Sequence, residues 1–122
     1  MDYEFKVLGA LKSKANSRII RYLKGRPISI KNPDALAFEK TAVLQLQKQF
    51  KRKKMIEDKV GLELDIYYPS NRNDLSPELF FDCLQKAGVL KNDRQIVEYS
   101  CFKKIDKLEP RVECCLYIIN EE

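Results

Sequence analysis

Residues 60–68, VGLELDIYY, decide the fold class of this chain of 122 residues. Every second residue is apolar, and the side chains of a β-strand point alternately to its two faces. This is the clearest strand pattern in the chain, and it predicts a strand with one face in the core. The residues of that face are Val60, Leu62, Leu64, Ile66 and Tyr68.

A loop over residues 69–73 and then a helix are expected to follow this strand. Ser76 suits the N-cap of the helix and Pro77 its first position, because Ser caps free N–H groups and Pro has none to satisfy. Gly88 suits the end of the helix. The apolar stripe between these limits predicts the buried face, which consists of Leu79, Phe80, Cys83, Leu84 and Ala87.

Before this unit, the sequence predicts a strand over residues 3–8 and a short strand over 27–31. The basic segment 9–26 between them shows no clear period. Asn32-Pro33-Asp34 predicts the start of a helix that runs to about Phe50. The expected buried residues of this helix include Leu36, Val43, Leu46 and Phe50. Residues 96–102 and 112–119 predict two closing strands.

This order predicts a single α+β domain over residues 1–122. We expect a mixed β-sheet of about four to five strands with two main helices packed on it. The two closing strands are the natural antiparallel pair. In an alternative arrangement, the strand–helix–strand unit around the second helix forms a parallel crossover, which would be right-handed.

Charge is spread unevenly along the chain. Residues 1–60 hold 15 Lys and Arg against 6 Asp and Glu, whereas residues 61–122 hold 8 against 12. The basic half suits a polyanion such as nucleic acid, and an unevenly charged solvated surface is the alternative. No apolar run approaches the ~20 residues that span a bilayer, and the acidic N-terminus lacks a signal-peptide pattern. We therefore expect no membrane partner and a cytoplasmic location.

The chain has four cysteines and no histidine. No two cysteines form a C-x-x-C pair, so buried apolar roles in a reducing compartment are expected and a zinc site is not. The absence of histidine excludes Ser–His and Cys–His nucleophile pairs. No Gly-rich phosphate loop is present, so no nucleotide cofactor is expected.

Two carboxylates flank the second predicted helix. Asp74 lies in the turn before the helix, and Asp93 lies in the turn before the next strand. If the two strands are neighbours, we expect both turns to open on the same side of the sheet. Mg²⁺ commonly takes one or two carboxylates together with water and phosphate oxygens, and it can activate water for phosphodiester cleavage. The alternative is that both residues serve only turn geometry and capping.

The run from Asn73 to Tyr99 resembles the core of the RusA-type Holliday junction resolvases. That family shows Asp-Leu-Asp-Asn-Leu-x-Lys, then a helix ending in Lys-Ala-Gly, then Asp-Asp-x-Gln-Val. The matching segments here are Asn73–Ser76 (NDLS), Lys86–Gly88 (KAG) and Asn92–Ile96 (NDRQI). The N-terminal part fits the family more loosely.

The resemblance implies a homodimeric, Mg²⁺-dependent endonuclease that binds four-way DNA junctions and makes paired symmetric nicks. It places the family's first catalytic aspartate on Asp74 and the later one on Asp93. The family's second aspartate falls on Ser76 and its functional lysine on Phe80, so two expected groups are missing. We expect Glu78, one turn from Asp74, to supply the lost charge to the metal. The alternative is that Glu78 is only an acidic residue in the first helical turn, where its charge interacts favourably with the helix dipole.

Six basic residues are expected to bind the DNA backbone through phosphate contacts. They are Lys12, Lys14, Arg18, Arg21, Arg26 and Arg72. Arg72 would hold the scissile phosphate. Lys24 and the basic run 51–54 are further candidates, although a basic run is more often a solvated surface.

The leading interpretation is a Holliday junction resolvase of DNA recombination and repair. One alternative is a relative that binds junctions but cuts poorly, because Ser76 and Phe80 replace catalytic groups. Another is a scaffold protein unrelated to DNA.

Overall fold

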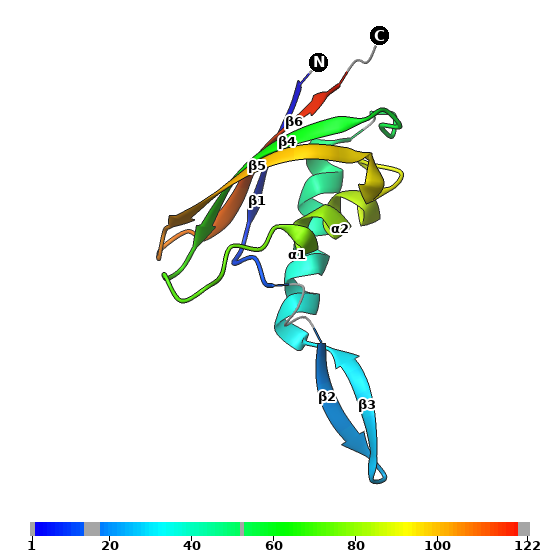
Figure 1. Cartoon of the computed structure of the whole chain (residues 1–122), viewed down its shortest axis with the longest axis vertical. Coiled ribbons are helices and arrows are strands. Elements are labelled where there is room, and N and C mark those ends of the chain that lie inside the picture. The colour runs from blue at the N-terminus through cyan, green and yellow to red at the C-terminus, as the bar shows by residue number, and fades with distance from the viewer. Residues whose placement is uncertain (1, 14–17, 52, 120–122) are drawn as a thin grey trace.

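The computed structural model describes residues 2–13, 18–51 and 53–119 (Figure 1). The strands are β1 (Asp2–Leu8), β2 (Arg18–Leu23), β3 (Arg26–Lys31), β4 (Val60–Tyr68), β5 (Ile96–Ile105) and β6 (Arg111–Ile118). The helices are α1 (Pro33–Gln49), α2 (Glu78–Lys86) and the short 3-10 helix η1 (Asp93–Gln95). One sheet has the order β1-β6-β4-β5, and β2 and β3 form a second sheet. The predicted α+β class with a mixed sheet and two main helices is confirmed.

β4 is an inner strand, antiparallel to β6 and parallel to β5. Its five predicted core residues are at most 2% exposed. The parallel alternative for the strand–helix–strand unit is therefore correct, and the antiparallel pairing of the two closing strands is wrong. β4 has one face buried along its whole length, which suits an inner position in the sheet. β5 exposes most of its side chains, which suits a position at the edge. β6 consequently lies on the other side of β4.

The start of α1 follows the sequence prediction. Asn32 Oδ1 accepts the N–H of Asp34 at 2.9 Å, and Pro33 occupies the first turn. The helix ends at Gln49, with Phe50 as its C-cap residue.

One face of α1 packs into the core beneath the sheet. Leu46 and Phe50 are buried as predicted, and Val43 packs against the core partly buried. Leu36 is 38% exposed, so its predicted burial is wrong. The buried stripe instead passes through Ala35, Phe38, Ala42 and Leu46, which leaves Leu36 beside it.

α2 starts at Glu78 with Pro77 as its N-cap, so the prediction of Ser76 as N-cap is wrong. The Ser76 hydroxyl donates to Glu78 Oε2 at 2.6 Å, and the Ser76 N–H donates to the Tyr68 hydroxyl at 3.1 Å. Gly88 follows the helix with a φ of 80°, the left-handed conformation that ends helices. The predicted apolar stripe of α2 is buried from Leu79 to Leu84.

β2 and β3 form a hairpin that projects away from the main sheet (Figure 1). Lys24 and Gly25 make its turn with φ values of 52° and 78°, as a type I′ turn requires. Every residue from 20 to 30 is exposed. The sequence predicted β3, in which Ile28 and Ile30 alternate with other residues, but not β2, whose sequence RIIRYL shows no alternation.

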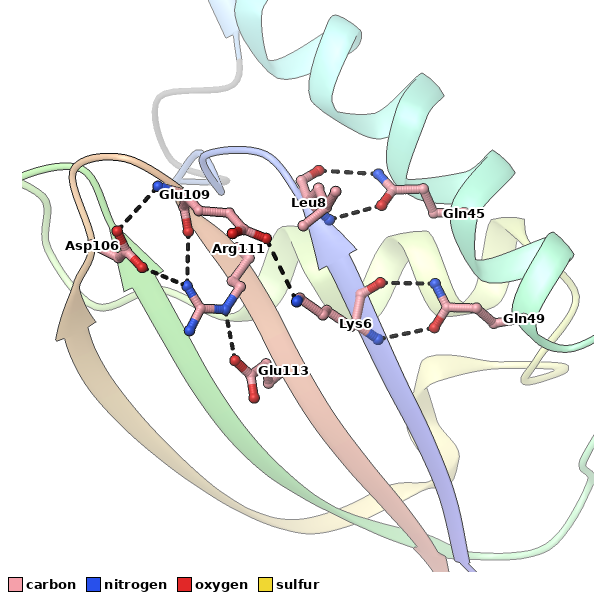
Figure 2. A network of polar contacts seen from close by, with 8 residues as sticks. All are labelled: Lys6, Leu8, Gln45, Gln49, Asp106, Glu109, Arg111 and Glu113. Atoms are coloured by element: carbon pink, nitrogen blue, oxygen red, sulfur yellow. Dashed lines mark hydrogen bonds and ion pairs between the residues drawn. The ribbon is translucent and has the colours of Figure 1, made fainter.

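Charged side chains hold the turn between β5 and β6 (Figure 2). Arg111 donates to Asp106 Oδ2 at 2.7 Å and to Glu113 Oε2 at 2.6 Å. The hydrogen bond from Arg111 lowers the pKa of Asp106 below its ordinary value. Lys6 of β1 pairs with Glu109 at 3.5 Å, so the turn is tied to the first strand.

Candidate active site

A polar pocket of about 260 Å³ lies where the C-terminal end of β4 meets the N-terminal end of α1. Three separate segments supply its polar groups, namely the chain after β1, the start of α1 and the loop after β4. Its lining residues are Leu11, Lys12, Ser13, Asn32, Asp34, Ala35, Tyr68, Arg72, Asn73 and Asp74.

The pocket combines two carboxylates with two cations. Asp34 and Asp74 supply the carboxylates, and Lys12 and Arg72 supply the positive charges. Carboxylate oxygens are ligands that Mg²⁺ prefers, and guanidinium and ammonium groups bind phosphate. The structure thus brings together three residues that the sequence singled out, Asp74, Lys12 and Arg72, and adds Asp34.

Tyr68 forms the buried wall of the pocket and positions the loop that carries Asp74. The Tyr68 side chain is 2% exposed, and its hydroxyl accepts the N–H of Ser76. Burial raises the pKa of Tyr68, so the hydroxyl stays protonated near neutral pH.

Glu78 is exposed in the first turn of α2 and does not line the pocket. Its carboxylate instead accepts the Ser76 hydroxyl at 2.6 Å. The missing aspartate position and the residue expected to compensate for it are therefore in direct contact.

Asp93 lies at the other end of the β4–α2–β5 unit. Its N–H donates to Gln85 Oε1 at 3.1 Å, near the end of α2. The following strand begins opposite Val60, at the start of β4. Asp74 follows the end of β4, so the expectation that both turns open on the same side of the sheet is wrong. In a parallel crossover, the chain leaves one end of the first strand and enters the next strand at the opposite end.

The position that the resemblance equates with the family's lysine lies in the core. The Phe80 side chain is fully buried in the core. A lysine there would have to bury its charge, which is costly without a partner. A functional cation cannot act from this position in the present fold.

The basic residues predicted to bind DNA fall into two places. Arg21 and Arg26 lie on the exposed hairpin, with Lys24 at its turn, and Lys12 and Arg72 line the pocket. Arg18 begins β2. Lys14 lies outside the described residues. Lys51, Lys53 and Lys54 follow the C-terminal end of α1. This helix is about 25 Å long and its N-terminal end is at the pocket, so these lysines lie away from the pocket.

Asp34 is the site residue that the sequence did not single out for chemistry. It was noted only as part of a helix start, and it lies far from Asp74 along the chain. No local pattern joins these two positions, because only the tertiary structure brings the start of α1 and the loop after β4 to one pocket.

All four cysteines are free; Cys83 and Cys114 are buried as expected, whereas Cys101 and Cys115 are only partly buried. Burial raises the pKa of the Cys101 thiol to about 11. This thiol is therefore protonated at neutral pH and is a poor nucleophile. Within the described ranges, no group of three His, Cys, Asp or Glu side chains is placed to hold a metal ion.

Comparisons with known proteins relate the chain to a family of endodeoxyribonucleases. The family model described as endodeoxyribonuclease RusA matches residues 9–117. A curated relative is the crossover junction endodeoxyribonuclease RusA of Aquifex aeolicus (strain VF5), which is 31% identical over 103 residues. The match covers 82% of this chain and 79% of the relative. Among the described residues, no helix has the length and apolar character needed to cross a membrane.

Proposed function

The chain belongs to the RusA family of junction-resolving endodeoxyribonucleases, and we propose that it cuts four-way DNA junctions with Mg²⁺, as a homodimer making paired symmetric nicks. The observation that supports this proposal is the pocket beside Asp74, where carboxylates and phosphate-binding cations line one cavity.

The residues of the pocket fit Mg²⁺. This ion commonly binds one or two carboxylates and keeps several waters, which matches the donors offered by Asp74 and Asp34. When bound, the ion would activate water and stabilise negative charge on the phosphate. Lys12 and Arg72 would orient the phosphate through charge-assisted hydrogen bonds.

Asp93 and Glu78 remain proposed members of the site. One subunit holds Asp93 and Asp74 at opposite ends of the β4–α2–β5 unit, so we assign Asp93 to the pocket of the second subunit in the homodimer. Glu78 would add the negative charge missing at Ser76, which it contacts directly.

Junction DNA would reach the pocket from the side of the hairpin. The hairpin, residues 18–31, contains five Lys and Arg and no Asp or Glu. The sheet face without helices instead carries Glu4, Glu63, Asp65 and Glu113 around one concavity, and these charges repel phosphate.

The decisive experiment is nicking of a synthetic four-way junction with added Mg²⁺. We expect nicking by the unmodified chain and a loss of ~100-fold or more in Asp74→Asn, with binding retained. Asp65→Asn is the matched control, because Asp65 lies on the open sheet face. Nicking that persists in Asp74→Asn would contradict the proposed site.

The same assay separates a second candidate, a junction-binding relative that cuts poorly. The observation that favours it is the loss of two expected groups at Ser76 and the buried Phe80. Tight junction binding without nicking in Mg²⁺ or Mn²⁺ would support this candidate over the nuclease.

The hairpin contribution can be measured through salt dependence. Replacing Arg21, Lys24 and Arg26 by Gln should reduce the slope of log affinity against log salt by about 0.9 for each phosphate that the variant no longer neutralises. The control replaces Lys40, Lys48 and Lys107 by Gln, which removes the same charge from exposed positions outside the hairpin. Equal slopes in the two variants would contradict a role of the hairpin in binding DNA.

A further inference from the structure

The two edges of the four-stranded sheet differ in how their backbone groups are satisfied. At the β1 edge, Gln49 accepts the N–H of Lys6 at 2.9 Å and donates to its carbonyl at 2.7 Å. Gln45 makes the same pair of bonds with Leu8, at 2.8 and 3.0 Å. Figure 2 shows both amides reaching from α1 to the strand. These side chains occupy positions that a further strand would need.

At the other edge, β5 runs for ten residues with only β4 beside it (Figure 1). The strand also exposes four large apolar side chains, Val97, Tyr99, Phe102 and Ile105, each at least 50% exposed. A long, open and apolar edge is a template for pairing with another strand.

We propose that β5 is the seam of the homodimer, where the β5 strands of two copies pair antiparallel and join their sheets into one. This inference rests on the homodimer of the proposed function and adds where the two subunits meet. A two-fold axis normal to the sheet relates the copies, as a closed dimer requires.

This symmetry limits the register of the seam. Opposite residues must share a face of the sheet, so their numbers differ by an even amount. With Cys101 on the axis, Glu98 faces Lys104 of the partner subunit and Tyr99 faces Lys103 of the partner subunit. Each pairing occurs twice by symmetry, and opposite charges across strands are stabilising.

The neighbouring register is less complementary. With Ser100 on the axis, Glu98 faces Phe102 of the partner subunit. The pair of opposite charges is then lost, and a charged side chain opposes an apolar one twice by symmetry. The side-chain order of β5 therefore favours the register centred on Cys101.

A second copy suits this edge better than DNA does. The cations of β5 already have contacts, since Lys103 donates to the carbonyl of Asn71 and Lys104 pairs with Asp65 at 3.5 Å. The adjoining sheet face is acidic. Phosphates would be repelled by the acidic face beside β5, whereas an identical strand offers equal length and a complementary charge pair.

The seam also accounts for the separation of Asp74 and Asp93. Antiparallel pairing sets the start of β5 beside the end of β5 in the partner subunit. Asp93 precedes the start of β5, and the pocket of Asp74 lies at the end where β4 and β5 finish. The seam therefore directs Asp93 of the partner subunit toward the pocket end of the first subunit.

Sedimentation of charge variants tests the seam. We expect the unmodified chain to be a dimer and Glu98→Lys to raise its dissociation constant about tenfold or more, because like charges then oppose each other twice. The double variant Glu98→Lys with Lys104→Glu should restore dimerisation. Glu63→Lys, on the inner strand β4, is the control with the same charge change and should leave the dimer unchanged.

Oxidative crosslinking supplies an independent readout. Opposite Cα atoms in an antiparallel pair lie ~4.5–5.5 Å apart, within the range that a disulfide spans. We expect an added oxidant to link the dimer through Cys101, and Cys101→Ser but not Cys115→Ser to abolish the link. A dimer whose dissociation constant does not change in Glu98→Lys, or that crosslinks through another cysteine, would overturn the seam.

The outcomes separate this inference from the proposed function. A chain that nicks junctions as a monomer, or as a dimer unaffected by the β5 variants, overturns the seam and leaves the nuclease intact. A β5-dependent dimer that binds junctions without nicking supports the seam and refutes the proposed nuclease site.

Discussion

The β1 edge and the β5 edge bound the same sheet, and two glutamine side chains of α1 close the β1 edge. Gln45 and Gln49 bond to the backbone of β1, whereas β5 offers its outer backbone groups and apolar side chains to solvent. Exposed edges promote unwanted pairing, and proteins usually block them. The contrast indicates that the β5 edge is kept open for a specific partner.

The largest expected effect comes from mixing two inactive variants. Neither Asp74→Asn nor Asp93→Asn should nick junctions alone. A mixed dimer joined at β5 contains one site with both aspartates, so equal mixing should restore about a quarter of the nicking of the unmodified chain. The measurement is nicking after the two variants are unfolded and refolded together.

The control for this prediction is mixing without refolding, so that subunits do not exchange. If both aspartates act within one subunit, every mixed dimer contains two damaged sites. No recovery of nicking after refolding would therefore exclude a site shared across the β5 seam.

A smaller effect is expected at the closed edge. Gln45→Ala with Gln49→Ala removes four hydrogen bonds to β1. We expect the free energy of unfolding to fall by about 2 kcal/mol, since exposed hydrogen bonds contribute modestly. Urea unfolding measures this change, and the uncovered β1 edge should also increase concentration-dependent association.

Gln47→Ala is the matched control, because Gln47 is an exposed glutamine on the same helix with no described bond to β1. It should change stability much less than the double variant. If both behave alike, the amides do not close the β1 edge, and the contrast between the two edges fails.

The smallest effect concerns the turn between β5 and β6. The pKa of Asp106 is lowered by its hydrogen bond from Arg111, so the ionised carboxylate stabilises the fold above its ordinary pKa. This stabilisation is lost as the pH falls through the ordinary value of about 3.9 and then through the lowered one. Asp106→Asn should therefore lower the urea midpoint slightly at pH 7, and the difference should vanish in acid.

Asp2→Asn, outside this turn, is the control and should show no comparable loss at pH 7. A difference between Asp106→Asn and the unmodified chain that grows toward low pH would contradict the role given to the Arg111 contact.

Much of the fold could be predicted because its signals are local. The alternation in residues 60–68, the Asn32 cap and the stripe from Leu79 to Leu84 each report which face of an element is buried. β2 was missed because its residues, unlike those of β3, do not alternate between apolar and polar. The N-cap of α2 was misplaced by one residue because Ser76 bonds to Glu78 instead.

The candidate site was predicted only in part. Asp74, Lys12 and Arg72 were chosen from residue type, position and family resemblance, and the structure brings them into one pocket. Asp34 was missed as a site residue because only the tertiary structure brings the start of α1 to the pocket that follows β4. The expectation that the turns of Asp74 and Asp93 open on the same side of the sheet was wrong. Sequence order does not show at which end of a parallel pair of strands each loop lies.

The sequence alone determined the secondary-structure elements with buried faces, the α+β class and the likeness to RusA nucleases, since each follows from local pattern and residue identity. Only the tertiary structure decided the strand order, the closed and open edges, and the gathering of Asp34 with Asp74. The physical reason is that a periodic pattern records whether a side chain is buried. The partner that buries it comes from distant segments, and only their packing selects it.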